Sequence, residues 1–322
     1  MHKILILGSE GYLGSVLVPY LRKLNYKITG VDKCFFGKHN KNSNNINIVK
    51  SDYAKLSKNF YKEFDYIIDL VNISNDPASE IDKNFTIKTN FKNKIKLYNK
   101  IKELKNIKKY IYMSSCSVYG NNTKIINEKS TPRPISLYSK LCLEFENYLN
   151  KQKKIDFTIL RLGTLYGWSP RMRYDIAINK IIRDMLFIRR IEILGGEQLR
   201  FFCYNMLACE TIGKILTIQD RKFENKILNI GVFNTNIINL AKKILKITKV
   251  KNTTLVHEKH NIDNRSYEVS MNTVKKLFKN LSFKKYVDNS ILKTFKKIKN
   301  DKEPFKKNKV TLNIYKKLLK NK

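Results

Sequence analysis

A glycine-rich turn near the N-terminus constrains the fold more than any other feature. The apolar run KILIL (3–7) leads into GSEGYLG, which places Gly8, Gly11 and Gly14 before a helical pattern. In a strand–turn–helix unit, the first glycine permits a tight turn, the second lets a ligand approach the backbone, and the third lets the helix pack on the sheet. Backbone N–H groups at the start of such a helix bind phosphate. We therefore predict a phosphate-binding turn that also includes Tyr12 and Leu13.

Asp32 indicates which phosphate ligand this turn binds. It ends the second predicted strand, YKITGVD, at the spacing from the glycines that is typical of a dinucleotide site. A carboxylate there hydrogen-bonds the adenosine ribose and repels a 2′-phosphate. The pattern predicts NAD as the cofactor, while the adjacent Lys33 leaves NADP open.

Further cofactor contacts are expected after the next two strands. Asp52 and Tyr53 follow INIVKS at the position of an adenine contact, although Asp52 also suits an exposed turn. Val71 ends the apolar run DYIIDLV, and Asn72 and Ser74 follow it. The carboxyl ends of parallel strands face the ligand in doubly wound sheets, so we predict that these residues line the cofactor site.

The alternation of apolar runs and helical patterns defines the fold class. Short strands separated by helix-length segments predict parallel βαβ units, and hence an α/β, Rossmann-type doubly wound sheet over residues 1–167. The rhythm changes after Tyr166, through a mixed segment (170–200), an apolar helix near 205–218 and a strand at ILNIGV to a Lys-rich tail. Residues 168–322 predict a smaller α/β substrate domain, with some segments returning to the Rossmann sheet.

Composition narrows the functional classes. The net charge of +37 is spread along all 322 residues together with abundant Asn and Ile, which indicates compositional bias more than a basic nucleic-acid surface. No run of about 18 apolar residues occurs, so we expect no membrane span and a cytoplasmic protein. The five cysteines lack CxxC spacing, which predicts reduced thiols and no metal site.

The segment MSSCSVYG (113–120) supplies candidate catalytic hydroxyls. It ends the strand KKYIY and so lies at the ligand-binding edge of the sheet. Ser115 is the candidate, because a serine there can hydrogen-bond a substrate oxygen and assist proton transfer to a phenol. Strand-end turn serines are the simpler structural interpretation.

These motifs, with PISLYSKLCLEFE and LRLGTLYGWSPRMRYD, resemble the extended short-chain dehydrogenase/reductase family of the NAD-dependent nucleotide-sugar epimerase/dehydratase type. The resemblance implies a nucleotide sugar between the two domains, hydride transfer to NAD, and a homodimer. It also implies a Ser or Thr, a Tyr base, and a Lys four residues after the Tyr. The substrate-binding candidates are Ser115, Thr164, Arg171, Arg173, Arg200 and Arg265.

The predicted catalytic pair departs from that pattern. Tyr138 takes the tyrosine position, where the resemblance implies both a proton acceptor and a cofactor contact, but Cys142 takes the lysine position. Lys140 is a doubtful substitute, because two residues along a helix it points about 200° away from Tyr138. A second register pairs Ser136 with Lys140 and lacks a phenol. A phenol with a pKa of about 10 needs a nearby cation to act as a base, and a lysine from another segment or the nicotinamide charge are the alternatives.

The sequence as a whole predicts an NAD-dependent epimerase, or a keto-sugar reductase, that acts on a nucleotide-activated sugar through a keto intermediate. The segment Ser115-Cys116-Ser117 lacks the acidic residues that drive water elimination, which argues against a dehydratase. Two alternatives stay open. One is a catalytically silent NAD-binding or scaffold homologue, favoured by Cys142, and the other is a basic RNA- or membrane-associated member of the family.

Overall fold

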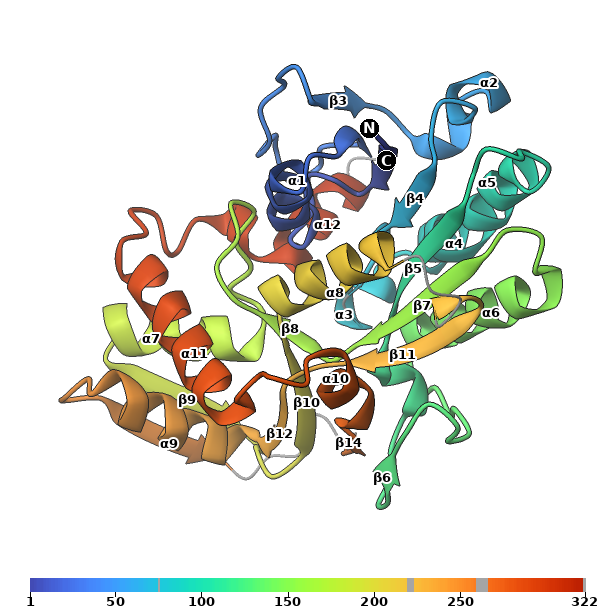
Figure 1. Cartoon of the computed structure of the whole chain (residues 1–322). Coiled ribbons are helices and arrows are strands. Elements are labelled where there is room, and N and C mark those ends of the chain that lie inside the picture. Colours follow the sequence, from blue (N-terminus) through green and yellow to red (C-terminus); the bar gives the residue numbers. More distant parts are fainter. Residues whose placement is uncertain (75, 219–222, 259–265, 321–322) are drawn as a thin grey trace.

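The chain folds around a seven-stranded parallel sheet. The computed structural model describes residues 1–74, 76–218, 223–258 and 266–320. Its strands run in the order β11-β7-β5-β4-β1-β2-β3 (Figure 1). Their bounds are β1 (Lys3–Leu7), β2 (Lys27–Asp32), β3 (Ile46–Lys50), β4 (Tyr66–Asp69), β5 (Lys109–Ser115), β7 (Phe157–Leu162) and β11 (Lys226–Ile230). The predicted doubly wound sheet is confirmed, and its strand order reverses between β1 and β4, where such folds bind ligands.

Helices cover both faces of this sheet. Along β1, Ile4 and Ile6 pack with one core, while Leu5 and Leu7 pack with another, as the period of two in a strand requires. The first core includes α1 (Gly14–Lys23) and α8 (Asn205–Thr217), and the second includes α5 (Asn93–Ile101) and α6 (Leu137–Gln152). The helical segment that ends in α5 is divided into α4 (Lys83–Ile87), the π-helical turn η2 (Lys88–Lys92) and α5 itself.

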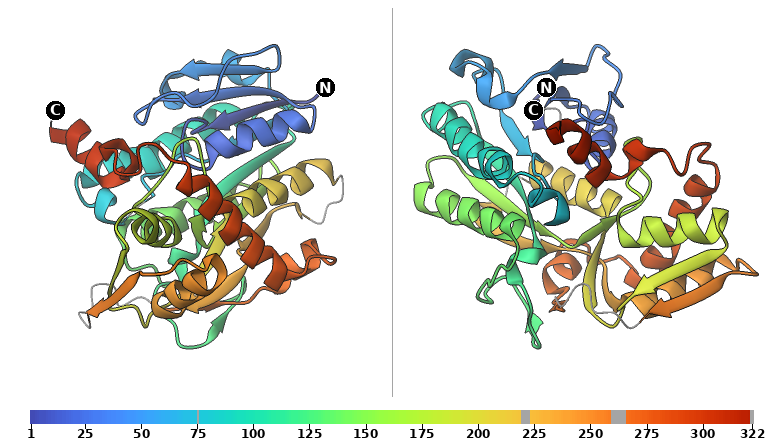
Figure 2. Two further views of the ribbon diagram at one scale, coloured as in Figure 1. Left: turned by 90° about the vertical axis from the view of Figure 1, so that its left-hand side faces the viewer. Right: turned by 180° about the vertical axis from the view of Figure 1, so that it is seen from behind.

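The C-terminal half builds a second, smaller group of elements (Figure 2). One sheet has the order β12-β10-β8, and β13 pairs with β9. The bounds are β8 (Thr164–Tyr166), β9 (Arg190–Leu194), β10 (Leu199–Tyr204), β12 (Phe233–Asn236) and β13 (Thr254–Glu258), with helices α7 (Ala177–Phe187), α9 (Ile237–Thr248) and α11 (Phe283–Lys299). The strand expected at ILNIGV is β11, which lies at the edge of the large sheet beside β7.

Short elements complete the described chain. They are η1 (Tyr53–Lys55), α2 (Lys58–Tyr61), α3 (Asp76–Ser79), η3 (Cys116–Tyr119), β6 (Ile125–Ile126), β14 (Glu268–Val269), α10 (Asn272–Leu277), η5 (Lys307–Lys309) and α12 (Thr311–Lys320). The Lys-rich tail thus contains helices α11 and α12, which the sequence analysis did not predict. Within the described ranges, no helix is long and apolar enough to cross a membrane, and no group of His, Cys, Asp or Glu side chains is arranged to hold a metal ion.

Candidate cofactor and substrate cleft

A cleft of about 760 Å³ opens at the carboxyl ends of the central strands. A smaller cavity of about 110 Å³ adjoins it, and Gly8, Gly11 and Asn72 line both. Among the predicted residues, the cleft is also lined by Tyr12, Leu13, Gly14, Ser115, Tyr138, Thr164, Arg171, Arg173 and Arg200. The smaller cavity is also lined by Asp32, Lys33, Asp52, Tyr53 and Val71. The fold therefore brings the predicted cofactor and substrate residues to one continuous space.

The glycine turn has the geometry that its sequence implies. Gly8 adopts a φ of +81°, a conformation that glycine reaches at no steric cost. A Cβ atom at Gly14 would lie only 2.2 Å from the Gly8 carbonyl oxygen. The start of α1 therefore packs directly on the turn, and only glycine is accommodated at position 14.

Asp32 and the buried Glu10 hold the turn against the loop after β2. The Asp32 carboxylate accepts the backbone N–H of Glu10 at 3.0 Å and that of Cys34 at 2.7 Å. Burial raises the pKa of Asp32, and these two hydrogen bonds oppose part of that rise. Glu10 accepts the backbone N–H of His39 and of Asn40. The sequence analysis did not single out Glu10, although an acidic residue inside a glycine turn was a signal available there.

Lys33 is paired within the smaller cavity. Its Nζ lies 2.8 Å from Asp52 Oδ2. Burial alone would raise the pKa of Asp52, but the hydrogen bond and charge of Lys33 lower it below its usual value. The cavity that adjoins the glycine turn is thus bordered by two carboxylates, Asp32 and Asp52, and by one ammonium that is already paired.

The residues present fit a bound dinucleotide. Gly8, Gly11 and Gly14 line the cleft with backbone atoms alone, because they carry no side chains. Asn72 donates from Nδ2 to the Met113 carbonyl at 3.0 Å, while its buried Oδ1 has no hydrogen-bond partner within the described chain. A backbone cradle beside an unsatisfied buried acceptor is suited to a polar ligand.

The candidate catalytic hydroxyls lie together at the end of β5. Ser115 Oγ accepts the Ser117 N–H at 3.1 Å and the Ser117 hydroxyl at 2.9 Å. A hydroxyl has two acceptor sites and one donor, so the Ser115 hydrogen is left to donate. Tyr138 lines the same cleft as Ser115, and Ser115 and Cys142 both affect the pKa of its phenol. Ser115 can therefore donate to the Tyr138 oxygen or to a substrate oxygen beside it.

Cys142 leaves this phenol without an adjacent cation. Burial raises the pKa of the Cys142 thiol to about 12, so the thiol is neutral at physiological pH. Burial and Cys142 together raise the pKa of Tyr138 well above its usual value, and the Ser115 hydrogen bond opposes part of that shift. Lys140, on the same helix, is exposed and does not line the cleft. The structure does not bring Lys140 to Tyr138.

A lysine from another segment lies behind Cys142. Lys94 on α5 is completely buried, and its Nζ lies 2.6 Å from Asp69 Oδ2 and 5.0 Å from the centre of the Tyr112 ring. Burial lowers the pKa of Lys94, while Asp69 and Cys142 oppose the decrease. Tyr112 and Tyr138 both lie near the Cys142 thiol and affect its pKa, while the buried Tyr112 hydroxyl has no hydrogen-bond partner within the described chain. Lys94 is therefore part of the surroundings of Cys142, but its closest charged partner is Asp69.

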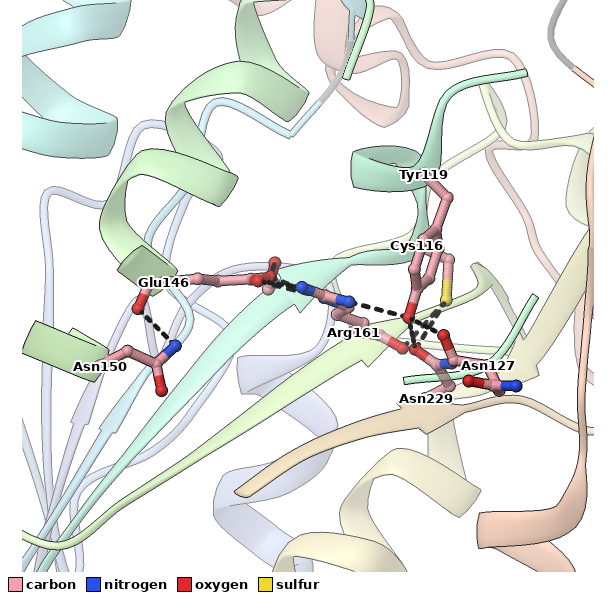
Figure 3. Close-up of polar contacts among 8 residues, drawn as sticks. Cys116, Tyr119, Asn127, Glu146, Asn150, Arg161 and Asn229 are labelled. Atoms are coloured by element: carbon pink, nitrogen blue, oxygen red, sulfur yellow. Dashed lines mark hydrogen bonds and ion pairs between the residues drawn. The ribbon is translucent and has the colours of Figure 1, made fainter. Parts of the chain in front are cut away.

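A buried polar network supports the end of β5 from below (Figure 3). Glu146 on α6 accepts the Ser114 hydroxyl at 2.5 Å and Arg161 Nη2 at 2.5 Å. Arg161 Nη1 donates to the Tyr119 hydroxyl at 2.8 Å, and Tyr119 donates to Asn229 Oδ1 at 2.9 Å. The network joins β5, α6, β7 and β11 directly under the segment that carries Ser115.

The predicted arginines differ in their surroundings. Arg173 forms an ion pair with Asp175, with Nη2 2.7 Å from Oδ2. Arg200 donates to the Leu199 carbonyl at 2.9 Å and lies 5.8 Å from the Tyr267 ring centre. Arg171 packs on the ring of Phe36 at 3.7 Å and donates to Thr311 Oγ1 at 3.0 Å. The predicted contact at Arg265 lies outside the described residues.

Several residues of the cleft were not predicted from sequence. They are Phe36, Asp76, Glu80, Asp175, Tyr267, Thr311 and Tyr315. Ser74, which was expected at this edge of the sheet together with Asn72, does line the cleft. Asp76 follows closely in sequence, so its position at the same sheet edge was a usable signal. Thr311 and Tyr315 come from α12, and nothing local in the Lys-rich tail indicates that it folds back onto the cleft.

A parallel sheet with a glycine turn at its switch point, and a Ser–Tyr pair beside that turn, defines a dinucleotide-dependent enzyme of the short-chain dehydrogenase/reductase class. The model of the NAD dependent epimerase/dehydratase family matches residues 4–231, and this chain belongs to that family. The predicted family, and with it an NAD-dependent enzyme of the nucleotide-sugar epimerase, dehydratase and decarboxylase group, is confirmed. The comparisons do not support the scaffold, RNA or membrane alternatives.

Individual relatives agree with this placement. An uncharacterized protein of Methanocaldococcus jannaschii is 30% identical over 275 residues, which cover 77% of this chain and 81% of that protein. A dTDP-D-glucose 4,6-dehydratase of Dictyostelium discoideum is 29% identical over 288 residues, and the match spans 77% of this chain but only 62% of the dehydratase. The solved UDP-glucuronic acid 4-epimerase of Bacillus cereus, in complex with UDP-glucuronic acid and NAD, shares the fold with a TM-score of 0.80 at 23% identity, covering 92% of this chain and 99% of the epimerase chain.

Proposed function

We propose that this protein is an NAD-dependent epimerase, or a keto-sugar reductase, that acts on a nucleotide-activated sugar. The observation that carries the proposal is that Tyr138 and Ser115 line the same cleft as the glycine turn. When bound, NAD would accept the hydride that leaves the sugar carbon. Tyr138 accepts the proton of the hydroxyl on that carbon, and Ser115 hydrogen-bonds the same oxygen, which gives a keto sugar.

The substrate belongs between the two halves of the chain. We place the cofactor on residues 1–167 and the sugar nucleotide against residues 168–322, which contribute Arg173 and Arg200 to the cleft. Guanidinium groups bind diphosphates through paired hydrogen bonds. The solved relatives with UDP-glucuronic acid and with UDP-N-acetylmuramic acid make UDP-sugars the first candidates.

The groups at the end of β5 favour an epimerase over a dehydratase. Cys116 is buried, and its sulfur donates to the Arg161 carbonyl at 3.2 Å, so no acid occupies this place. The carboxylates that line the cleft are Asp76 and Glu80, from the region of α3, and Asp175, which forms an ion pair with Arg173. The pair that faces a sugar hydroxyl is therefore Tyr138 and Ser115, which suits oxidation and reduction at one carbon.

The smaller cavity favours NAD over NADP. A 2′-phosphate carries a strong negative charge, and Asp32 and Asp52 are the carboxylates that border this cavity. The one lysine that lines it, Lys33, is held by Asp52 at 2.8 Å. The ribose hydroxyls of NAD instead hydrogen-bond a carboxylate.

The test begins with purified protein. Nucleotide released by denaturation is identified by chromatography, and the protein is then incubated with UDP-, GDP-, CDP- and dTDP-sugars while NMR follows the products. An epimerised or reduced sugar supports the proposal, whereas a 4-keto-6-deoxy product identifies a dehydratase and contradicts it.

The variant Cys142→Lys tests the role of Tyr138. Since only the phenolate accepts a proton, the raised pKa of Tyr138 means that the wild-type rate rises with pH across the neutral range. An ammonium at position 142 lowers that pKa and moves the pH–rate profile to lower pH, while Cys142→Ser leaves the profile in place. Bound NAD with no turnover in either wild type or Cys142→Lys contradicts the epimerase.

A further inference from the structure

The last helix of the chain covers the junction between the large cleft and the smaller cavity. Tyr315 of α12 is 6% exposed and lines both spaces, and its ring meets Phe36 edge-on at 5.6 Å. The apolar face of α12 packs with Ile73 and Ala78, so the helix lies against α3 (Figures 1 and 2). Helix α12 therefore forms one wall of the junction between the cleft and the smaller cavity.

Arg171 lies beside α12 at this junction, and the hydrogen-bonding groups of its guanidinium are not all used. It is 4% exposed and lines the cleft, and its Nε has no hydrogen-bond partner within the described chain. Burial and the charge of Arg173 lower the pKa of Arg171 to about 9, although Asp175 opposes this. Because Asp175 already forms an ion pair with Arg173, the cluster holds two guanidinium charges against one carboxylate. A buried excess of positive charge favours an anionic ligand.

The loop that carries Arg171 is attached to the glycine-turn helix. The backbone N–H of Arg171 donates to Ser15 Oγ at 3.4 Å, and that hydroxyl contacts Ser169 Oγ at 2.8 Å. Ser169 also donates to the Tyr12 carbonyl at 2.8 Å. These contacts place Arg171 beside the first turn of α1, where doubly wound folds bind a pyrophosphate.

Phe36 defines which part of the cleft Arg171 faces. The guanidinium carbon lies 3.7 Å from the centre of this ring, and the ring lines both the large cleft and the cavity that contains Asp32. Arg171 thus lies between the glycine turn and the smaller cavity that contains Asp32. Arg173, by contrast, approaches Ser74 Oγ at 3.5 Å.

We propose that Arg171, positioned by Thr311 and Phe36, binds the pyrophosphate of the dinucleotide cofactor, and that Tyr315 of α12 covers the same part of the cofactor. This assignment rests on the proposed function, because it takes NAD as the cofactor. It moves Arg171 from the sugar nucleotide, where the sequence analysis placed it, to the cofactor. Since α12 supplies both Thr311 and Tyr315, cofactor binding and α12 docking stabilise each other.

Calorimetric titration of nucleotide-stripped protein tests the assignment. Arg171→Met is expected to weaken NAD binding about 10- to 100-fold, as the loss of a charge-assisted hydrogen bond to phosphate implies. Arg171→Lys keeps the charge without the planar fork and is expected to fall in between. Arg190→Met is the matched control, because Arg190 forms an exposed pair with Glu192 away from the cleft.

A second measurement follows α12 directly. NAD is expected to slow tryptic cleavage at Lys316 and Lys317 in the wild type, and Tyr315→Ala is expected to abolish that protection. Asn313→Ala, at an exposed position of the same helix that trypsin does not cleave, controls for a general effect on α12. Protection that persists in Tyr315→Ala contradicts the proposal that Tyr315 covers the cofactor.

The outcomes separate the sources of the diphosphate. UDP affinity is measured at saturating NAD, and an Arg171→Met variant that loses UDP but keeps NAD affinity overturns the assignment in favour of the sugar nucleotide. Equal NAD affinity in wild type and variant overturns it as well. Wild-type protein that binds no NAD refutes the proposed function itself, and this result is distinguishable because the unaltered chain fails.

Discussion

The two ends of the cleft use different chemistry. At the glycine turn, the groups available to a ligand are backbone atoms and the guanidiniums of Arg171 and Arg173. At the other end they are neutral hydroxyls, those of Ser115 and Tyr138, beside the neutral thiol of Cys142. The guanidiniums of the first end are charged at neutral pH, whereas the reactivity of the second end depends on proton loss from a buried phenol. Cofactor binding and turnover are therefore expected to respond separately to mutation and pH.

The largest effect is expected at the Tyr138 end. Tyr138→Phe removes the proton acceptor and is expected to lower kcat by about 10²- to 10⁴-fold, with the affinity for NAD unchanged. Tyr148→Phe is the control, since Tyr148 lies on the same helix and donates to Asn99 outside the cleft. If Tyr138→Phe also lost affinity for NAD, cofactor binding and turnover would not be separate properties of the two ends of the cleft.

The network beneath the Tyr138 end is expected to dominate stability. Arg161→Met leaves Glu146 buried without its cation, which costs about 3–5 kcal/mol in the free energy of unfolding. Urea denaturation measures this loss, and Arg190→Met, which breaks an exposed pair, is expected to cost at most about 1 kcal/mol. A loss below 1 kcal/mol for Arg161→Met would show that Glu146 is not held as a buried carboxylate.

Two glycine variants sharpen the description of the other end. Gly14→Ala places a Cβ atom 2.2 Å from a backbone oxygen and is expected to cost about 3 kcal/mol of stability together with NAD binding. Gly11→Ala meets its nearest atom at 3.2 Å, so we expect a smaller change in stability but weaker NAD binding. Denaturation and NAD titration of the two variants distinguish an effect on the folding of the turn from an effect on the approach of NAD to it. Equal stability of both variants contradicts the close packing at Gly14.

The smallest effect concerns acid stability at the charged end. Arg173 lowers the pKa of Asp175 to about 2 although burial opposes this, so the ion pair contributes stability above the usual carboxyl pKa. That contribution, up to about 2 kcal/mol, is lost as the pH falls from about 4 to about 2. Asp175→Asn is expected to flatten the pH dependence of the unfolding free energy in this window. An unchanged slope would refute the ion pair as its source.

Local patterns predicted the glycine-turn end well. The strand, the turn and the helix α1 lie within residues 3–23, and Asp32 ends the adjacent strand, so neighbouring residues determine their arrangement. The mixed segment 170–200 was harder to interpret, although it contains α7 and β9. In the Lys-rich tail, α12 carries Leu312, Tyr315 and Leu319 at helical spacing, but only the fold shows that this face packs with Ile73 and Ala78.

The sequence by itself determined the cofactor turn, the carboxylate of Asp32 and the absence of a lysine four residues after Tyr138. Only the tertiary structure decided what surrounds Cys142 and Arg171. Lys94 reaches the Cys142 region from another helix, and Thr311 reaches Arg171 across 140 positions of sequence. Such contacts arise from the packing of whole elements, which buries their apolar faces and brings distant side chains together as a consequence. No local spacing encodes them, and for that reason the position of α12 over the proposed cofactor site could be seen only in the folded structure.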